Sequence, residues 1–109
     1  MSKHRLDVLE QLADTVDERS AAQPETSYTA RLLSQGTEKC AKKLGEEAVE
    51  TALAAMTTDR DHLISETADL LYHLLVLLKS SGVPLSAVMT ELEVRMTRGR
   101  LSEKAARQL

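Results

Sequence analysis

The stretch HLISETADLLYHLLVLLKS, residues 62–80, decides how the rest of the chain folds. From Leu70 to Leu78 almost every side chain is apolar, so a helix built from these residues has no wide face for solvent. The run is far too short to cross a bilayer. It therefore predicts a central helix that is buried by its neighbours. A monomeric bundle of this size rarely needs so much apolar surface, so we expect a dimer that shares this helix.

The neighbouring segments also show helical spacing, interrupted by proline and glycine. Leucine and alanine (18 and 13 residues) far outnumber valine and isoleucine (7 and 1), which favours helix over strand. The sequence predicts an all-α bundle of four to five helices that forms a single domain over residues 1–109. The expected helices cover residues 3–21, 27–34, 37–56, 62–80 and 85–97, and the tail 100–109 adds a short helix or frays.

Several residues fit the expected helix ends. Ser27 or Thr26 is expected to cap the second helix, Thr37 the third, and Asp59 or Asp61 the fourth. Three further residues are expected to end or start helices: Gly36, Pro84 and Gly99.

The overall charge and the single cysteine limit the class of protein. A net charge of −3 gives no nucleic-acid footprint, and the charged N-terminus does not resemble a signal peptide. With only Cys40, no internal disulfide forms, and we expect a small buried side chain in a cytoplasmic protein. Residues 38–69 hold eight acids against four bases, whereas residues 95–109 hold five bases against one acid. Such segments suit a metal and a phosphate, or they pair with each other.

The stretch KKLGEEAVETALAA, residues 42–55, places Glu46, Glu47 and Glu50 within two turns of one expected helix. Like charges at this spacing repel by about 0.2–0.5 kcal/mol per pair. On the buried helix, Glu66 and Asp69 lie three residues apart, without a Lys or Arg four residues further on.

A turn of about five residues joins these two helices, so they should pack antiparallel. Glu47 and Glu50 would then face Glu66 and Asp69 in a box of four carboxylates. Oxygen ligands in that number suit Mg²⁺ or Mn²⁺, and carboxylates beside an apolar helix need a cation to stay ionised. The alternative is a solvated acidic surface, but the second pair enters an apolar helix and therefore favours a metal.

Other residues have competing interpretations. Gly45 either permits close approach of a substrate or helix, or marks a break between two helix segments. His73 follows Asp69 by four residues and is either a partner of the metal ligands or a core residue. We expect Met56, Met89 and Met96 to fill the core.

The acidic pattern, EExxE followed after fifteen residues by ExxD, resembles the signature of the all-α nucleoside triphosphate pyrophosphohydrolases. Within that group, SYTARLL, KLGEEAVE and ETADLLYHLLVLL are similar to the phosphoribosyl-ATP pyrophosphohydrolase family. The likeness is close from Ser27 to Leu78 and loose outside this range. Near the C-terminus, EKA at 103–105 followed by Arg107 is similar to the end of the family, although the preceding segment is compressed.

The resemblance implies Mg²⁺-dependent hydrolysis of phosphoribosyl-ATP to phosphoribosyl-AMP and diphosphate, the second step of histidine biosynthesis. It implies that Glu46 is an outer ligand or the base that orients water. It also implies a homodimer or a higher homo-oligomer, with phosphoribosyl-AMP cyclohydrolase as the functional neighbour. The metal ligands implied by the resemblance are Glu47, Glu50, Glu66 and Asp69.

Basic and polar side chains are expected to hold the substrate. Lys42 and Lys43 are the preferred phosphate ligands, with Lys39 one turn earlier, although all three also suit a solvated face. Ser27, Tyr28 and Arg31 belong to the SYTARLL segment, which is expected to contact ribose or phosphate; half-buried packing is the alternative for Tyr28.

Two other functions remain open at this point. One is a pyrophosphatase that removes free nucleotides such as dCTP with the same acidic box. The other is a helical dimerisation module without catalysis, whose acids only solvate a surface.

Overall fold

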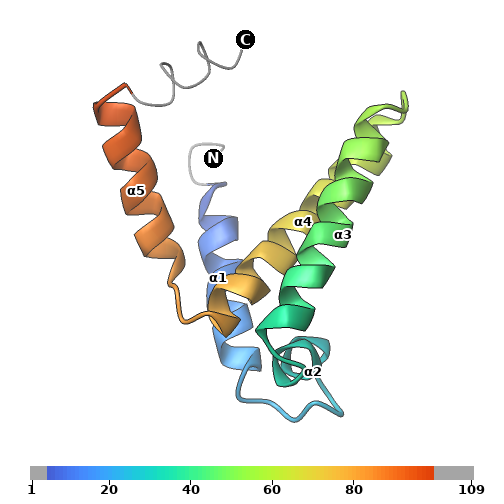
Figure 1. Ribbon diagram of the computed structural model, residues 1–109, viewed down its shortest axis with the longest axis vertical. Coiled ribbons are helices and arrows are strands. Elements are labelled where there is room, and N and C mark those ends of the chain that lie inside the picture. The colour runs from blue at the N-terminus through green and yellow to red at the C-terminus, as the bar shows by residue number, and fades with distance from the viewer. Residues whose placement is uncertain (1–4, 100–109) are drawn as a thin grey trace.

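The computed structural model describes residues 5–99, and this range contains helices and no strand (Figure 1). The predicted all-α class is confirmed, and the expected tail helix at 100–109 lies outside the described residues. The helices are α1 (Asp7–Arg19), α2 (Tyr28–Ser34), α3 (Thr37–Ala55), α4 (Arg60–Ser80) and α5 (Leu85–Thr97).

Side-chain hydrogen bonds explain where α2 and α4 begin. The Oγ of Ser27 accepts a hydrogen bond from the amide of Ala30 at 3.1 Å, and Oδ1 of Asp59 accepts one from the amide of His62 at 3.1 Å. Both are N-caps that satisfy a free amide of the first turn. The prediction that Thr37 caps α3 is wrong by one residue, because Gly36 occupies the cap with a φ of 94° that favours glycine.

The α3–α4 pair forms the long axis of the fold, and α1 and α2 pack against its lower part (Figure 1). The buried apolar centre combines residues from α1, α2, α3 and α4: Val16, Leu32, Cys40, Leu75 and Val76. Cys40 is 1% exposed, as expected for a small core residue. Thus α4 is central, as predicted.

Polar contacts reinforce this lower part. Lys79 donates to Asp17 and so ties α4 to α1, and the Thr37 hydroxyl donates to the carbonyl of Ser80 at 3.3 Å. The hydroxyls of Thr29 and Tyr72 lie 2.5 Å apart and join α2 to α4.

Leu71 and Leu74 on α4 are 38% and 36% exposed, because no helix among residues 5–99 covers that side. In the expected dimer a second chain would cover this side of α4. One expectation about burial is wrong. The methionines predicted to fill the core are exposed: Met56 (83%), Met89 (38%) and Met96 (62%). Met56 follows the end of α3 and Met96 lies on α5, where both are largely exposed, whereas Met89 on α5 lines a hollow that it shares with α1.

Gly45 does not break a helix, because α3 is continuous from Thr37 to Ala55. A Cβ at Gly45 would meet nothing within 4 Å, so no other helix among residues 5–99 approaches it closely. Close approach of a substrate at Gly45 stays a prediction.

The molecule is unusually open. In Figure 1 the α3–α4 pair rises on one side and α5 on the other, and α5 buries none of its residues among those described. The radius of gyration is 15.8 Å, whereas a compact domain of this length has about 13 Å. The accessible surface of 8088 Å² exceeds the value of about 6,000 Å² for a compact protein of this mass.

No single helix among residues 5–99 has the length and apolar character needed to cross a membrane. Among these residues, α4 and α5 have sufficient length and apolar character only when they are taken together, and the two helices are bent by 108° relative to each other.

Candidate functional site

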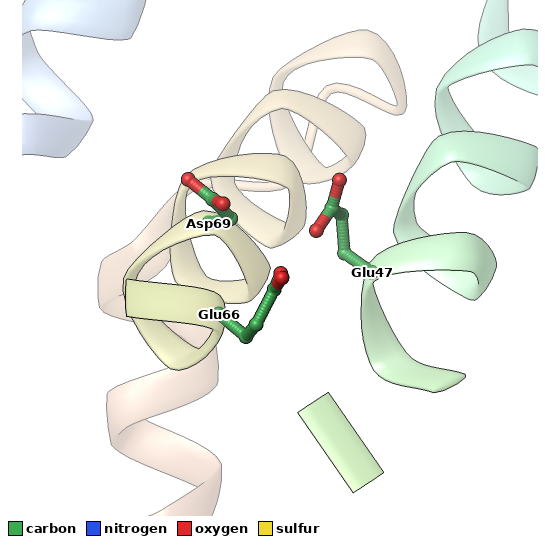
Figure 2. Close-up of side chains that lie close together, drawn as sticks. All are labelled: Glu47, Glu66 and Asp69. Atoms are coloured by element: carbon green, nitrogen blue, oxygen red, sulfur yellow. The ribbon is translucent and has the colours of Figure 1, made fainter. Parts of the chain in front are cut away.

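Carboxylates from α3 and α4 converge about halfway along the helix pair. Glu47 extends from α3 toward Glu66 and Asp69 on α4, and one oxygen of each lies within 4.8 Å of the others (Figure 2). We call these three residues the carboxylate cluster. The spacing of three residues places Glu66 and Asp69 on one face of α4, and the antiparallel packing brings Glu47 opposite them.

The cluster is electrostatically unfavourable in isolation. Glu47 Oε2 and Glu66 Oε1 are buried and accept no hydrogen bond from any of the residues described. Burial raises the pKa of the Glu47 carboxyl, and the negative charges of Glu50, Asp69 and Glu66 raise it further. Lys43 opposes this rise only partly. A buried carboxylate without a partner is costly, so these oxygens require a cation or a proton.

The donor set suits a hard divalent cation. Such ions prefer carboxylate oxygens, and the two buried oxygens offer lone pairs that no donor among residues 5–99 uses. The residues present therefore fit Mg²⁺ or Mn²⁺. The fourth expected ligand, Glu50, is exposed and lies close enough for its charge to raise the pKa of Glu47, but it is not one of the three residues whose oxygens lie within 4.8 Å of one another.

A hollow of about 320 Å³ adjoins the cluster toward the free end of the helix pair. Pockets for small molecules begin at about this size. Its lining combines acidic, apolar and polar side chains: Glu50, Leu53, Ala54, Thr57, His62 and Glu66.

The structure separates the expected phosphate ligands. Lys43 is half-buried beside the cluster, and its Nζ lies 3.6 Å from Oε1 of the exposed Glu46. Lys39 is exposed on the same side of α3, one turn before Lys43, because residues four apart share a face. Lys42 is exposed on the adjoining face, one turn before Glu46.

His73 is both a core residue and a neighbour of the cluster. It is 6% exposed, and its Nε2 lies 4.0 Å from Glu47 Oε1, too far for a hydrogen bond. Burial and the charge of Lys43 lower the pKa of His73, although Asp69 and Glu46 act against this. The imidazole is therefore mainly neutral at pH 7.

The SYTARLL segment lies next to His73. The rings of Tyr28 and His73 are 6.4 Å apart in an edge-on arrangement, and the Arg31 guanidinium lies 5.6 Å from the centre of the Tyr28 ring. Both Tyr28 and Arg31 are exposed, so a ligand can reach them. Ser27 is buried and caps α2, which gives its side chain a structural role.

Sequence reasoning missed Thr51 and Tyr72. The Thr51 hydroxyl lies between the main chains of α3 and α4, and Tyr72 packs between Tyr28 and His73. Helical spacing places Thr51 on the face of Glu47, four residues earlier. Its contact with α4 depends on how the two helices are aligned, which the spacing within one helix cannot give.

Helices without strands, with carboxylates facing one another across an antiparallel pair, define the class that the sequence resembles, the all-α nucleoside triphosphate pyrophosphohydrolases. The comparison with protein families is more specific. The family described as Phosphoribosyl-ATP pyrophosphohydrolase matches residues 9–96, which is most of the chain. The chain belongs to the phosphoribosyl-ATP pyrophosphohydrolase family and is an enzyme, a hydrolase.

Individual relatives agree. The phosphoribosyl-ATP pyrophosphatase of Rhizobium rhizogenes is 58% identical over 99 residues, covering 91% of this chain and 95% of the relative. The phosphoribosyl-ATP pyrophosphatase of Methylobacterium nodulans is 61% identical over 92 residues, covering 84% of this chain and 86% of the relative. The phosphoribosyl-ATP pyrophosphatase of Cereibacter sphaeroides is 53% identical over 102 residues, covering 94% of this chain and 99% of the relative.

The raised pKa of Glu47 predicts an unusual pH dependence of stability. Because the folded protein holds this proton more tightly than the unfolded chain does, the ionised group lowers the free energy of unfolding at pH 7. This loss of stability should diminish as the pH falls toward 4.5, the ordinary pKa of a glutamate carboxyl in an unfolded chain. Glu47→Gln should therefore raise the stability of the metal-free protein at pH 7, and the gain should shrink on acidification. Urea unfolding in EDTA at a fixed protein concentration measures both effects.

Glu46→Gln is the matched control, since it removes the same charge from the exposed neighbouring residue. A Glu47→Gln variant that is less stable than the wild type at pH 7, or a gain that does not change with pH, would contradict the strain assigned to the cluster.

Proposed function

We propose that this enzyme hydrolyses phosphoribosyl-ATP between the α- and β-phosphates, giving phosphoribosyl-AMP and diphosphate. This is the second step of histidine biosynthesis. The carboxylate cluster supports the proposal most strongly, because two of its buried oxygens have no hydrogen-bond partner in the described part of a chain of this family. Hydrolysis of a phosphoric anhydride needs little covalent chemistry from the protein. It needs charge neutralisation and positioning, which such a cluster can support.

Glu47, Glu66 and Asp69 would hold Mg²⁺, or Mn²⁺ in its place, with Glu50 completing the set from the edge of the hollow. When bound, the ion neutralises charge on the phosphate oxygens and lowers the pKa of a coordinated water. The hollow beside Glu50 and Glu66 provides space for the phosphate chain next to these ligands.

Residues around the cluster would handle the proton and the remaining phosphate charge. Glu46 is exposed and directly precedes Glu47 on α3, and it would accept the proton of the attacking water. Lys43 is the preferred cation, because its Nζ lies 3.6 Å from Glu46 Oε1 and its charge acts on Glu47. Lys39 and Lys42, which are exposed on the preceding turn, would contact phosphate oxygens further from the reacting bond.

The other end of the substrate would lie toward α2. Tyr28 and Arg31 are exposed and connect to the cluster through His73, which supports contacts to a ribose or its phosphate. Ser27 would contribute indirectly, by capping α2 and so holding Tyr28 and Arg31 in place.

We also propose that the protein is a homodimer. The chain exposes more accessible surface than a compact monomer of its mass would. The difference is of the same order as the area that a stable protein–protein interface buries. Val49, Leu53 and Met56 are 59%, 62% and 83% exposed and follow one another along one side of α3. Soluble monomers rarely leave such a patch uncovered, and a second copy would cover it.

The proposed setting follows from the reaction. A biosynthetic enzyme of this type would work in the cytoplasm, and phosphoribosyl-AMP cyclohydrolase would consume its product. No contact with nucleic acid or membrane is part of this proposal.

The reaction is tested by measuring released diphosphate with phosphoribosyl-ATP, dCTP and the common nucleoside triphosphates. We expect Mg²⁺-dependent release that EDTA abolishes, with phosphoribosyl-ATP as the preferred substrate. Glu66→Gln should lower kcat/KM by more than about a hundredfold, beyond the effect typical of groups that only surround metal ligands. Helical circular dichroism should remain unchanged.

Glu38→Gln is the matched control, because Glu38 is exposed in the first turn of α3, far from the cluster. Much faster turnover of dCTP would replace the proposed substrate with a free deoxynucleotide. Full activity of Glu66→Gln, or release that persists in EDTA, would refute the proposed site.

The dimer is tested with Val49→Lys, which places a charge on the exposed side of α3. In a monomer this side chain would lie in water and change little, whereas in a dimer the charge would be buried without a partner. Analytical ultracentrifugation at micromolar concentration should give twice the chain mass of 12.0 kDa for the wild type and a dissociated or unfolded variant.

Gln23→Lys adds the same positive charge to the exposed α1–α2 connection and should leave the dimer intact. A wild type that sediments as a single chain, with full activity, would contradict the proposal.

A further inference from the structure

The hydroxyl of Thr51 contacts the main chains of both helices that form the carboxylate cluster. Its Oγ1 lies 2.8 Å from the carbonyl oxygen of Glu47 on α3 and 3.1 Å from that of Glu66 on α4. Both distances are within hydrogen-bond range. Glu47 and Glu66 are also the residues whose side chains carry the buried oxygens without partners. One half-buried hydroxyl therefore lies between the backbones that carry these two carboxylates.

A threonine hydroxyl has one proton to donate, so the two carbonyls share it. The bond to Glu47 is the usual contact of a helical threonine with the carbonyl four residues earlier. The approach to Glu66 is different, because it joins two helices. Thr67 provides the comparison: it is half-buried next to Glu66 and donates to Leu63 at 2.7 Å, but makes no hydrogen bond to another helix within residues 5–99.

We propose that Thr51 is a positioning residue that fixes the distance between α3 and α4 at the cluster, and thereby favours a small divalent cation. The inference rests on the proposed function, because it assigns a role to Thr51 only if the cluster binds a metal. Mg²⁺ binds oxygen at 2.0–2.1 Å and requires near-ideal geometry, whereas Ca²⁺ accepts 2.3–2.6 Å and irregular geometry. A change of a few tenths of an ångström between the helices is therefore enough to alter the preference.

Replacement by valine makes a change of this size. It keeps the branched shape but puts a methyl group where the hydroxyl lies 3.1 Å from the Glu66 carbonyl. Carbon–oxygen contacts of this kind are usually 3.3–3.6 Å, so the two helices must separate slightly. Glu47 would move away from Glu66 and Asp69, while every carboxylate remains present.

The test is metal binding by the complete protein, followed by electron paramagnetic resonance of Mn²⁺, with Mg²⁺ and Ca²⁺ as competitors. Thr51→Val should weaken binding of Mn²⁺ and Mg²⁺ by about tenfold or more, the range found for groups that orient metal ligands. Its affinity for Ca²⁺ should fall less, so the ratio of Mg²⁺ to Ca²⁺ affinity should decrease. Thr51→Ser restores the hydroxyl and should restore this ratio, whereas Thr67→Val should leave it unchanged.

The outcomes separate this inference from the proposed function. A wild type that binds Mn²⁺ at the cluster together with an unchanged affinity ratio in Thr51→Val overturns the role of Thr51 alone. An equal loss in Thr67→Val also overturns it, since any threonine near Glu66 would then have the same effect. A wild type that binds no Mn²⁺ removes the proposed metal site and this inference together. If Thr51→Val does not fold, Thr51→Ala removes the hydroxyl that joins the two helices without pushing them apart. The loss of the fixed spacing should still lower the ratio of Mg²⁺ to Ca²⁺ affinity, and an unchanged ratio in Thr51→Ala overturns the role of Thr51.

Discussion

The repulsion among the carboxylates between α3 and α4 is the constraint on which the rest of the structure depends. Glu47 and Glu66 each bury an oxygen that accepts no hydrogen bond from the described chain, and Asp69 adds further negative charge within 4.8 Å. A chain optimised only for stability would place apolar residues at these positions. The strain is understandable if a cation normally offsets it, because buried charges in proteins are paired or coordinate metals. Such local conflicts between stability and sequence are typical of functional sites.

The α3–α4 pair has two regions that differ in how the rest of the fold packs against them, and the carboxylates lie between these regions. Below the cluster, α1 and α2 pack against α3 and α4, and Asp17–Lys79 and Thr29–Tyr72 reinforce this part. Above the cluster, α3 and α4 pack against each other, and no other helix among residues 5–99 lies beside them (Figure 1). Several apolar side chains there are exposed: Val49, Leu53 and Ile64. The cluster lies where these two regions meet. A rigid base on one side and an open surface on the other would let the site keep its geometry and still admit a nucleotide.

Much of this could be predicted from the sequence because helical periodicity is a local property. The helices, their ends within a few residues, and the convergence of Glu47 with Glu66 and Asp69 all follow from spacings of three and four residues and a short turn. The burial of Cys40 and the central position of α4 also follow from the apolar pattern.

The remaining features depend on how one helix lies against another, which a single sequence does not specify. The contact of Thr51 with Glu66 requires the relative alignment of α3 and α4. The exposure of Met56 and Met96 was missed because an apolar residue suits a core and an interface between copies equally well. The spacing groups Glu50 with the other acids, and it does line the hollow together with Glu66, but how close its oxygens come to the cluster depends on the alignment of the two helices.

The most direct test of the central claim is a crystal structure of the protein with Mn²⁺, analysed by anomalous scattering. If the carboxylate cluster holds the ion, an anomalous peak should lie between α3 and α4, with oxygens of Glu47, Glu66 and Asp69 as ligands. Crystals that contain Mn²⁺ but give no peak at this position, with the carboxylates instead protonated or paired to lysines, would contradict it.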